Sequence, residues 1–146
     1  SVPNFTPENE PFEIGKAYVL NEGKDVTIFA TGHTVWEALL AAETLETEGI
    51  CAEVINIATI KPLDEKAVVA SALKTKAVVV AEEHNSAGGL GELIAGVLAK
   101  RFPTPMEFVN GADKFGQSGS PAELMAAYGL DAPHIAEAAR TVISRK

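Results

Sequence analysis

Short runs of apolar and β-branched residues alternate with longer amphipathic stretches along most of the chain. The short runs predict buried strands at residues 26–30, 51–57, 77–81 and 106–109. The amphipathic stretches predict helices at residues 35–48, 64–74, 90–101, 120–128 and from residue 131 onward. Strands that alternate with helices through short connections form parallel sheets with right-handed crossovers. We therefore expect an α/β fold, a three-layer α/β/α domain.

Two of the strands have predicted places in the sheet. Residues 77–81, Ala-Val-Val-Val-Ala, are apolar throughout, which is typical of a strand buried on both faces, so we expect this strand at the sheet centre. Residues 18–20 predict a further short strand, and a turn-like tetrapeptide follows it at residues 21–24. This strand should run antiparallel to the next one, as the antiparallel edge of a mostly parallel sheet of about five strands.

Residues with cap-forming side chains mark the expected helix starts. Thr34 and Glu37 have the spacing of a capping box, in which each side chain bonds a free backbone N–H group of the first turn. Asp64 and Asp131 are predicted to cap the second helix and the last helix. A second capping box, with proline at the first helical position, stands at residues 120–123.

Apolar residues at helical spacing indicate the face that each helix turns toward the sheet. In the first helix they are Val35, Leu39, Ala42 and Leu45. In the second they are Leu63, Ala67, Ala70 and Leu73. The third helix has the clearest stripe, Leu90, Leu93, Ile94, Val97 and Leu98. In the last helix they are Ile135, Ala138, Ala139, Val142 and Ile143.

Composition and net charge limit the number of domains, the partners and the compartment that we expect for this protein. The chain has 146 residues, 47% of them apolar and 22% charged, which fits one compact domain without a second. Its net charge of −8 argues against nucleic acid and against an acidic membrane surface as partners. The single cysteine, Cys51, can form no internal disulfide, and no apolar run approaches the roughly 20 residues of a membrane span. We therefore expect an intracellular, cytoplasmic protein.

The negative charge lies mainly in the first third of the chain. Residues 1–49 hold nine acids and two bases, whereas residues 50–146 hold eleven acids and ten bases. Residues 1–11 include three prolines, which is typical of a linker. We therefore expect a linker at residues 1–11 and the folded domain at residues 12–146.

Ligands of open α/β sheets bind beyond the carboxyl ends of the strands, so the loops there hold the candidate functional residues. The richest loop is residues 82–91, Glu-Glu-His-Asn-Ser-Ala-Gly-Gly-Leu-Gly. A glycine-rich turn that opens a helix presents backbone N–H groups to an anion, which makes Gly32, His33, Gly88 and Gly89 a candidate anion-binding site. The alternative is that small residues here let the helix pack closely on the sheet.

The polar residues of the same loop allow a second interpretation. Glu82, Glu83 and His84 have the side chains of an acid/base or metal set, but neighbours at a strand end point to opposite faces and cannot all converge on one ion. We interpret Glu82, Glu83, His84 and Asn85 as a candidate interface, because polar residues in loops commonly serve recognition.

The remaining reactive side chains stand apart from one another in the sequence. His33 follows the first parallel strand, and His134 falls in the first turn of the last helix, where we expect it at the surface. Cys51 has no neighbouring His or basic residue, which favours a structural thiol over a nucleophile. Neither a Gly-x-Ser-x-Gly nor a His-Glu-x-x-His motif is present. Residue types and spacing thus predict an acidic α/β domain without a self-sufficient active site.

Five segments, in order, resemble a known family. They are residues 12–17, Phe-Glu-Ile-Gly-Lys-Ala; 22–32, Glu-Gly-Lys-Asp-Val-Thr-Ile-Phe-Ala-Thr-Gly; 56–64, Asn-Ile-x-Thr-Ile-Lys-Pro-Leu-Asp; 82–91; and 115–124, Phe-Gly-x-Ser-Gly-Ser-Pro-x-Glu-Leu. Together they resemble the carboxy-terminal domain of transketolase, and most closely that of the split or short transketolases. Deoxyxylulose-phosphate synthase and the β subunits of 2-oxo-acid dehydrogenases carry a similar last domain and stay as alternatives.

The resemblance implies a part in moving a two-carbon ketol unit from a ketose phosphate to an aldose phosphate. In this family, thiamine diphosphate and Mg²⁺ lie between a pyrophosphate domain and a pyrimidine domain, whose motifs do not occur in this sequence. The resemblance therefore assigns no catalytic, cofactor-binding or metal-binding residue here. It implies that the chain packs on the pyrimidine domain, contributes to a homodimer and is inactive alone, with residues 1–11 similar to the linker that leaves the pyrimidine domain. A free-standing module that holds a phosphorylated or nucleotide effector at Gly32 and Gly88 is the alternative of another class.

Overall fold

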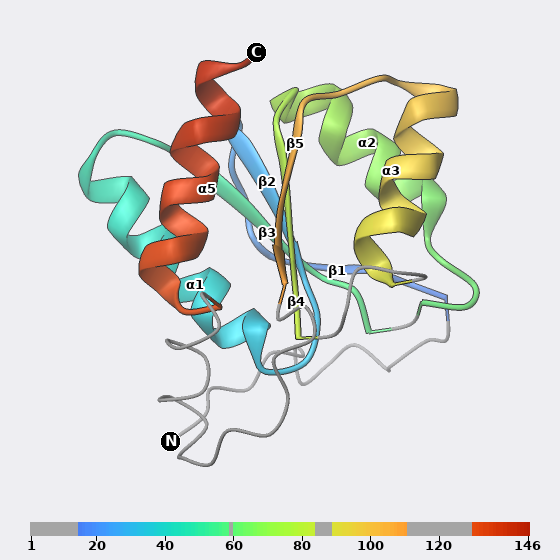
Figure 1. Ribbon diagram of the computed structural model, residues 1–146, viewed down its shortest axis with the longest axis horizontal. Helices are drawn as coiled ribbons and strands as arrows, with labels where there is room; N and C mark the ends of the chain where they lie inside the picture. Colours follow the sequence, from blue (N-terminus) through green and yellow to red (C-terminus); the bar gives the residue numbers. More distant parts are fainter. Residues whose placement is uncertain (1–14, 59, 84–88, 111–129) are drawn as a thin grey trace.

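The structure is a computed structural model that describes residues 15–58, 60–83, 89–110 and 130–146. In chain order its elements are β1 (Tyr18–Asn21), β2 (Val26–Ala30), α1 (Thr34–Thr47), β3 (Ala52–Asn56), α2 (Glu65–Thr75), β4 (Val78–Glu82), α3 (Leu90–Arg101), β5 (Met106–Asn110) and α5 (Ala132–Ser144). The strands form one sheet in the order β1-β3-β2-β4-β5 (Figure 1). The helix predicted at residues 120–128 lies outside the described residues.

Helices cover both faces of this sheet. α1 and α5 lie on one face, where the core contains Ile28, Val54 and Ile135, and α2 and α3 lie on the other, where it contains Phe29 and Ile94 (Figure 1). Consecutive side chains of a strand point to opposite faces, so the inner strands contribute to both cores. β2, β3, β4 and β5 are parallel. The arrangement confirms the predicted three-layer fold with a mostly parallel sheet.

The predicted positions of two strands need adjustment. β4 is buried along its whole length inside the sheet, but the middle place belongs to β2, which pairs with both β3 and β4. β1 is an antiparallel edge strand as predicted, but it pairs with β3, placing Tyr18 opposite Asn56. β3 lies between β1 and β2 in the sheet, so the chain must cross the start of β3 on its way from β1 to β2. Gly23 makes this crossing, since a Cβ there would lie 2.3 Å from the Ala52 carbonyl carbon.

The buried face of α2 differs from the predicted one. We expected the apolar stripe of Leu63, Ala67, Ala70 and Leu73 to face the sheet, but the buried residues are Val68, Ser71, Ala72 and Thr75. Leu73 is 51% exposed. The reason is that two hydroxyl side chains of α2 bond polar groups on the sheet, which fixes the rotation of the helix. The predicted stripes of α3 and α5 are confirmed, since Leu90, Ile94 and Leu98 are buried in α3, and Ile135, Ala139 and Val142 in α5.

Two of the predicted caps are confirmed and one is wrong. Asp64 accepts from the third residue of α2, and Asp131 caps α5 in the same way. The capping box at Thr34 and Glu37 does not form, because α1 has no side-chain cap of this kind. The Thr34 hydroxyl bonds backbone carbonyls instead, among them that of Ala81, the residue before the end of β4, at 2.9 Å. Glu37 accepts from the backbone N–H of α5's first residue, at 2.9 Å.

Candidate functional site

Two adjacent carboxylates stand at the carboxyl end of β4, in the loop predicted to carry function. Glu82 turns toward α3, where its two oxygens accept from the backbone N–H groups of Leu90 at 2.9 Å and Gly91 at 2.6 Å. The Glu82 side chain is 3% exposed. A carboxylate at the start of a helix is favourable because it bonds free N–H groups and opposes the helix dipole. Glu82 therefore anchors the start of α3 to the end of β4.

Glu83 turns to the opposite face. Its Oε1 accepts from the backbone N–H of His33 at 2.7 Å, just before α1, and lies 3.8 Å from His33 Nδ1. Gly32 is needed at this contact, because its φ is +62° and a Cβ there would lie 3.0 Å from Glu83 Oε1. Glu82 and Glu83 thus bond different helix starts, as expected of two neighbours at a strand end.

These contacts bear on both predicted roles of the loop. Backbone N–H groups that an external anion would need at Leu90, Gly91 and His33 already bond side chains of this chain. The anion-binding role of Gly32, His33, Gly88 and Gly89 stays a prediction, with Gly88 outside the described residues.

Glu82 is 3% exposed and bonds the start of α3, so its oxygens are used within the domain, and its place at an interface stays a prediction. The side chain of Glu83 is 37% exposed and keeps that role as a prediction. His84 and Asn85 lie outside the described part of the chain. At Gly91 the alternative of close packing is supported, since a Cβ would lie 2.8 Å from the Phe108 ring.

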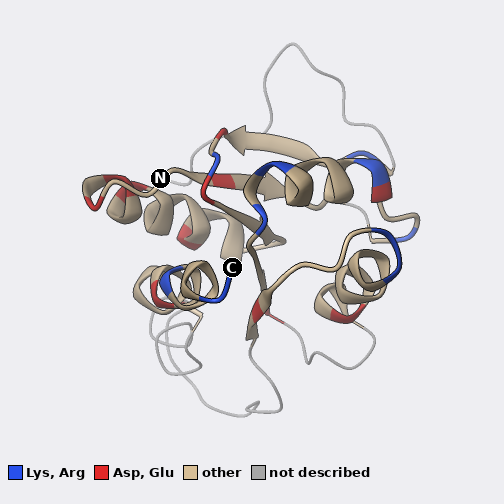
Figure 2. Cartoon of the chain, turned by 90° about the horizontal axis from the view of Figure 1, so that it is seen from above, with Lys and Arg blue, Asp and Glu red and all other residues tan. Residues whose placement is uncertain are grey.

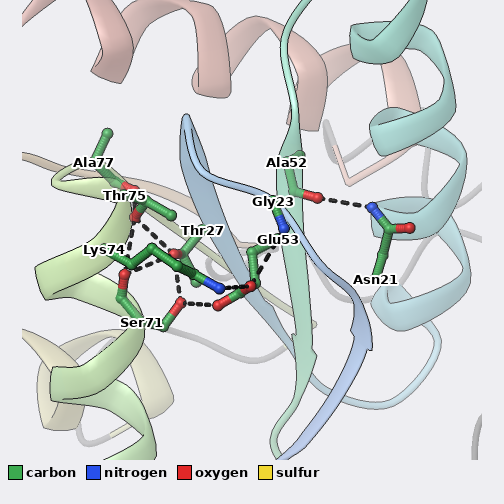
Figure 3. Close-up of polar contacts among 9 residues, drawn as sticks. All are labelled: Asn21, Gly23, Thr27, Ala52, Glu53, Ser71, Lys74, Thr75 and Ala77. Atoms are coloured by element: carbon green, nitrogen blue, oxygen red, sulfur yellow. Dashed lines mark hydrogen bonds and ion pairs between the residues drawn. The ribbon is translucent and has the colours of Figure 1, made fainter.

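A second polar cluster, which the sequence did not predict, lies between the sheet and α2 (Figure 3). Its centre is Glu53 on β3, which is 2% exposed. The Glu53 carboxylate accepts from the backbone N–H of Gly23 at 3.2 Å and from the Ser71 hydroxyl at 2.7 Å, and it pairs with the Lys74 ammonium. The buried charge thus has a partly exposed counter-ion and further donors, as a stable buried carboxylate requires.

The hydroxyl groups beside Glu53 form a chain with one direction (Figure 3). Ser71 donates its proton to Glu53, so the contact of 2.6 Å between the Ser71 and Thr27 hydroxyls requires Thr27 to donate. Thr27 then accepts from Thr75, whose hydroxyl lies 2.7 Å away. Each of the three hydroxyl protons is thus donated to one acceptor along the chain. The signal in the sequence was faint: two hydroxyl residues one helical turn apart, and a polar residue inside each of two apolar strands.

The other reactive residues are dispersed. His134 is half-exposed in the first turn of α5, as predicted, and pairs with Asp131. Cys51 is exposed just before β3 and does not belong to the core, although its N–H bonds Asp25 Oδ2 at 2.7 Å. Within residues 15–58, 60–83, 89–110 and 130–146, no three His, Cys, Asp or Glu side chains could hold a metal ion. No helix of the described parts is long and apolar enough to cross a membrane.

The described surface carries shallow grooves. One groove of about 360 Å³ runs between β5 and α5 past Phe108 and His134. Another, also of about 360 Å³, lies between β1 and α2 and is lined by Ala17, Val19, Glu53, Ile55, Ala67, Ala70, Ser71 and Lys74. In the second groove the Ser71 hydroxyl donates to the Glu53 carboxylate, which also pairs with Lys74. These contacts join α2 to the sheet, and the grooves present surfaces on which a partner could pack.

The described elements define an α/β domain with a mixed five-stranded sheet and helices on both of its faces. Residues 15–135 match the family model described as "Transketolase, C-terminal domain". The chain belongs to this family, as its sequence motifs predicted.

Known relatives support the assignment. The chain is 50% identical over 139 residues to the 6-deoxy-6-sulfo-D-fructose transketolase subunit SqwH of Clostridium sp. (strain MSTE9), covering 95% of this chain and 43% of that protein. It is 36% identical over 140 residues to a subunit of the apulose-4-phosphate transketolase of Phocaeicola vulgatus, covering 94% of this chain and 45% of that protein. A solved structure described as "Split gene transketolase, inactive beta4 tetramer" superposes with a TM-score of 0.92 at 44% identity, covering 98% of this chain and 47% of that one. The chain thus spans less than half the length of these relatives.

Proposed function

We propose that this chain is the carboxy-terminal domain of a split-type transketolase that depends on thiamine diphosphate and Mg²⁺. The reaction would move a two-carbon ketol unit between sugar phosphates. The observation that carries the proposal is the family match over residues 15–135, together with 50% identity to a transketolase subunit more than twice as long as the aligned region. The relatives are named for different sugars, so the proposal gives a reaction class and no particular sugar.

In this proposal the domain serves assembly and the chemistry takes place elsewhere. The described residues do not fit the cofactor: they offer no cluster of metal ligands, and Glu82 and Glu83 occupy N–H groups at two helix starts that could otherwise bind a diphosphate. The pyrophosphate and pyrimidine domains, in the same or a separate chain, would hold thiamine diphosphate and Mg²⁺. The loop at residues 82–91 would lie at a contact in the assembled homodimer, with Glu83 as its described carboxylate that keeps exposed surface.

Reconstitution tests the proposal. We expect titration of thiamine diphosphate and Mg²⁺ into the chain alone to give no heat of binding, and ketol transfer to need a mixture with the polypeptide of the same genome that carries the other two domains. Micromolar cofactor binding by the chain alone would contradict the assembly role. A mixture that neither associates nor transfers ketol units would contradict the transketolase assignment.

We propose that the enzyme to which this chain belongs is located in the cytoplasm. A cytoplasmic enzyme agrees with the single cysteine of the sequence, which can form no internal disulfide. Fractionation of cells that express the complete protein, followed by detection of this chain, measures the compartment directly.

A further inference from the structure

The outer side of α2 carries an apolar stripe that the core does not use. Ala67, Ala70 and Leu73 have the spacing of a packing face, yet α2 turns its other side to the sheet. Ala70 and Leu73 are exposed and Ala67 is half-buried, whereas Leu63, just before the helix, packs against the core. A helix with apolar residues on two sides is typical of one that packs on two neighbours. In the described structure α2 packs on the sheet and on α3, and Ala70 and Leu73 stay exposed beside both neighbours.

The edge strand β1 extends the same apolar surface. Val19 is 51% exposed, as is Leu73, and both are unusually exposed for large hydrophobic side chains. The groove of about 360 Å³ between β1 and α2 connects these elements, and its floor contains Ile55 with Ala67 and Ala70. We call the surface of Val19, Ala67, Ala70 and Leu73, with this groove, the α2–β1 face. Val19 lines the groove, and Leu73 lies one helical turn from Ala70 on α2. The other exposed large hydrophobic residues of the described parts lie on other elements, Trp36 on α1 and Phe108 on β5.

The chain enters the domain beside this face. Ala17 lines the groove, and its backbone N–H donates to Asp64 Oδ2 at 2.9 Å, while Oδ1 of the same carboxylate caps α2. Gly15 packs against Pro62, since a Cβ at Gly15 would lie 3.1 Å from Pro62 Cγ. The entering segment is therefore fixed to the start of α2. Whatever precedes residue 15 in the assembled protein reaches the domain at the rim of the α2–β1 face.

Charge adds to the chemistry of this face. α2 carries Lys66 and Lys74 beside the apolar stripe, and its one acid, Glu65, pairs with Arg101 on α3. α1, on the other side of the sheet, carries acidic residues and no Lys or Arg (Figure 2). Lys74 pairs with Glu53 at the end of the groove and is 46% exposed. The face therefore fits an apolar partner surface with an acidic rim.

We propose that the α2–β1 face is the docking surface for the part of the enzyme that precedes residue 15, a partner of apolar surface with an acidic rim. This inference rests on the proposed function, which supplies the partner: the polypeptide region that carries the cofactor-binding domains. Relatives are more than twice as long as the region that matches this chain, so a partner of sufficient size exists in them. An apolar partner would bury the two residues that are half-exposed here and recover the hydrophobic free energy of their burial.

The test compares polar substitutions on this face with one elsewhere. The double variant Val19→Ser/Leu73→Ser is mixed with the cofactor-binding polypeptide of the same genome, and the dissociation constant is measured by sedimentation. We expect about 30-fold weaker association, from the loss of two half-exposed aliphatic side chains at an interface. Phe108→Ser is the matched control, because Phe108 is 46% exposed on β5, at the opposite edge of the sheet. Its effect should stay below about threefold.

Outcomes separate this inference from the proposed function. The melting temperature and circular dichroism of each variant chain check that folding is unchanged. If the wild-type mixture associates and transfers ketol units while the double variant binds as tightly as Phe108→Ser, the docking surface is elsewhere and the inference falls. If the wild-type chain associates with no cofactor-binding polypeptide, the proposed function falls first. Where both parts form one polypeptide, the same variants are compared by proteolysis of residues 1–14, which we expect to be faster in the double variant.

Discussion

Two groups of buried or half-buried carboxylates lie on one sheet, and their hydrogen bonding is satisfied to different degrees. One is Glu53 with Lys74 and the hydroxyl groups between β3 and α2, here called the β3–α2 cluster, and the other is Glu82 with Glu83. At the β3–α2 cluster, Glu53 binds a hydroxyl, a backbone N–H and an ammonium, and the hydroxyl chain ends on it. At the end of β4, Glu82 is equally complete, but the adjacent Glu83 bonds one backbone N–H and keeps 37% of its side chain in solvent. A carboxylate whose bonding is complete stabilises the domain, whereas one with exposed surface is free to meet a partner.

The largest effect is expected at Glu53. Glu53→Ala removes an acceptor from three donors in a buried site and leaves a cavity, so the free energy of unfolding should fall by about 3 kcal/mol. Urea denaturation of the isolated chain measures this change. Glu22→Ala is the control, since Glu22 is exposed in the turn before β2, and it should change stability by less than about 0.5 kcal/mol. An equal loss of stability in the two variants would contradict the stabilising role of the contacts that Glu53 makes.

Glu82 and Glu83 provide a direct comparison within one loop. In Glu82→Gln one oxygen becomes an amide donor that faces a backbone N–H, so one donor at this buried site loses its acceptor, and we expect a loss of about 2 kcal/mol in unfolding free energy. Glu83→Gln keeps an oxygen for the N–H of His33, and its loss should be below about 0.5 kcal/mol. Thermal melts of both variants check the difference. A larger effect at Glu83 would reverse the assignment of the anchoring residue.

A smaller effect is expected along the hydroxyl chain. Ser71→Ala removes the link between Thr27 and Glu53, but Thr27 can turn its proton to the Ser71 backbone carbonyl, which lies 3.5 Å away. We expect a loss of about 1 kcal/mol. Ser144→Ala, at an exposed hydroxyl of α5, serves as control. A double-mutant cycle of Ser71→Ala with Glu53→Ala should be clearly non-additive, because both changes break the same chain, and additive effects would contradict it.

The smallest effect is expected at an exposed pair away from both clusters. Arg140 on α5 donates two hydrogen bonds to Glu48 after α1, at 2.8 and 2.6 Å. These bonds lower the pKa of Glu48 from its ordinary value of 4.5, desolvation opposes the lowering, and the charge of Arg140 adds to it to a lesser extent. The pKa of Arg140 is raised, chiefly by the same hydrogen bonds.

A carboxyl whose folded pKa is lowered stabilises the fold above its unfolded pKa, and this contribution is lost as pH falls through the folded value. The stability difference between wild type and Arg140→Gln should therefore be fully present at pH 7, begin to decline near pH 4.5 and be lost as pH falls through the lowered pKa of Glu48. Thermal melts at several pH values measure it. A difference that persists unchanged at low pH would show that packing of the Arg140 stem, and not its charge, joins α1 to α5.

Local and periodic patterns in the sequence were enough to predict the fold class, most of its elements and the family. Alternating strands and helices, the caps at Asp64 and Asp131, the stripe of α3 and the family motifs all depend on residues within a few turns of each other. Such signals act through the backbone of one element, so the sequence carries them directly.

Contacts between distant segments were decided by the tertiary structure. Glu37 looks like half of a capping box, yet it bonds the start of α5, 95 residues away. The stripe of α2 looks like a core face, yet Ser71 and Thr75 turn the helix so that the stripe faces outward. Glu82 looks like a surface residue, yet it is buried under α3. In each case a polar group forms a hydrogen bond with a group that only folding brings within about 3 Å. The free energy cost of leaving a buried polar group without a hydrogen bond exceeds the preference set by the local sequence pattern.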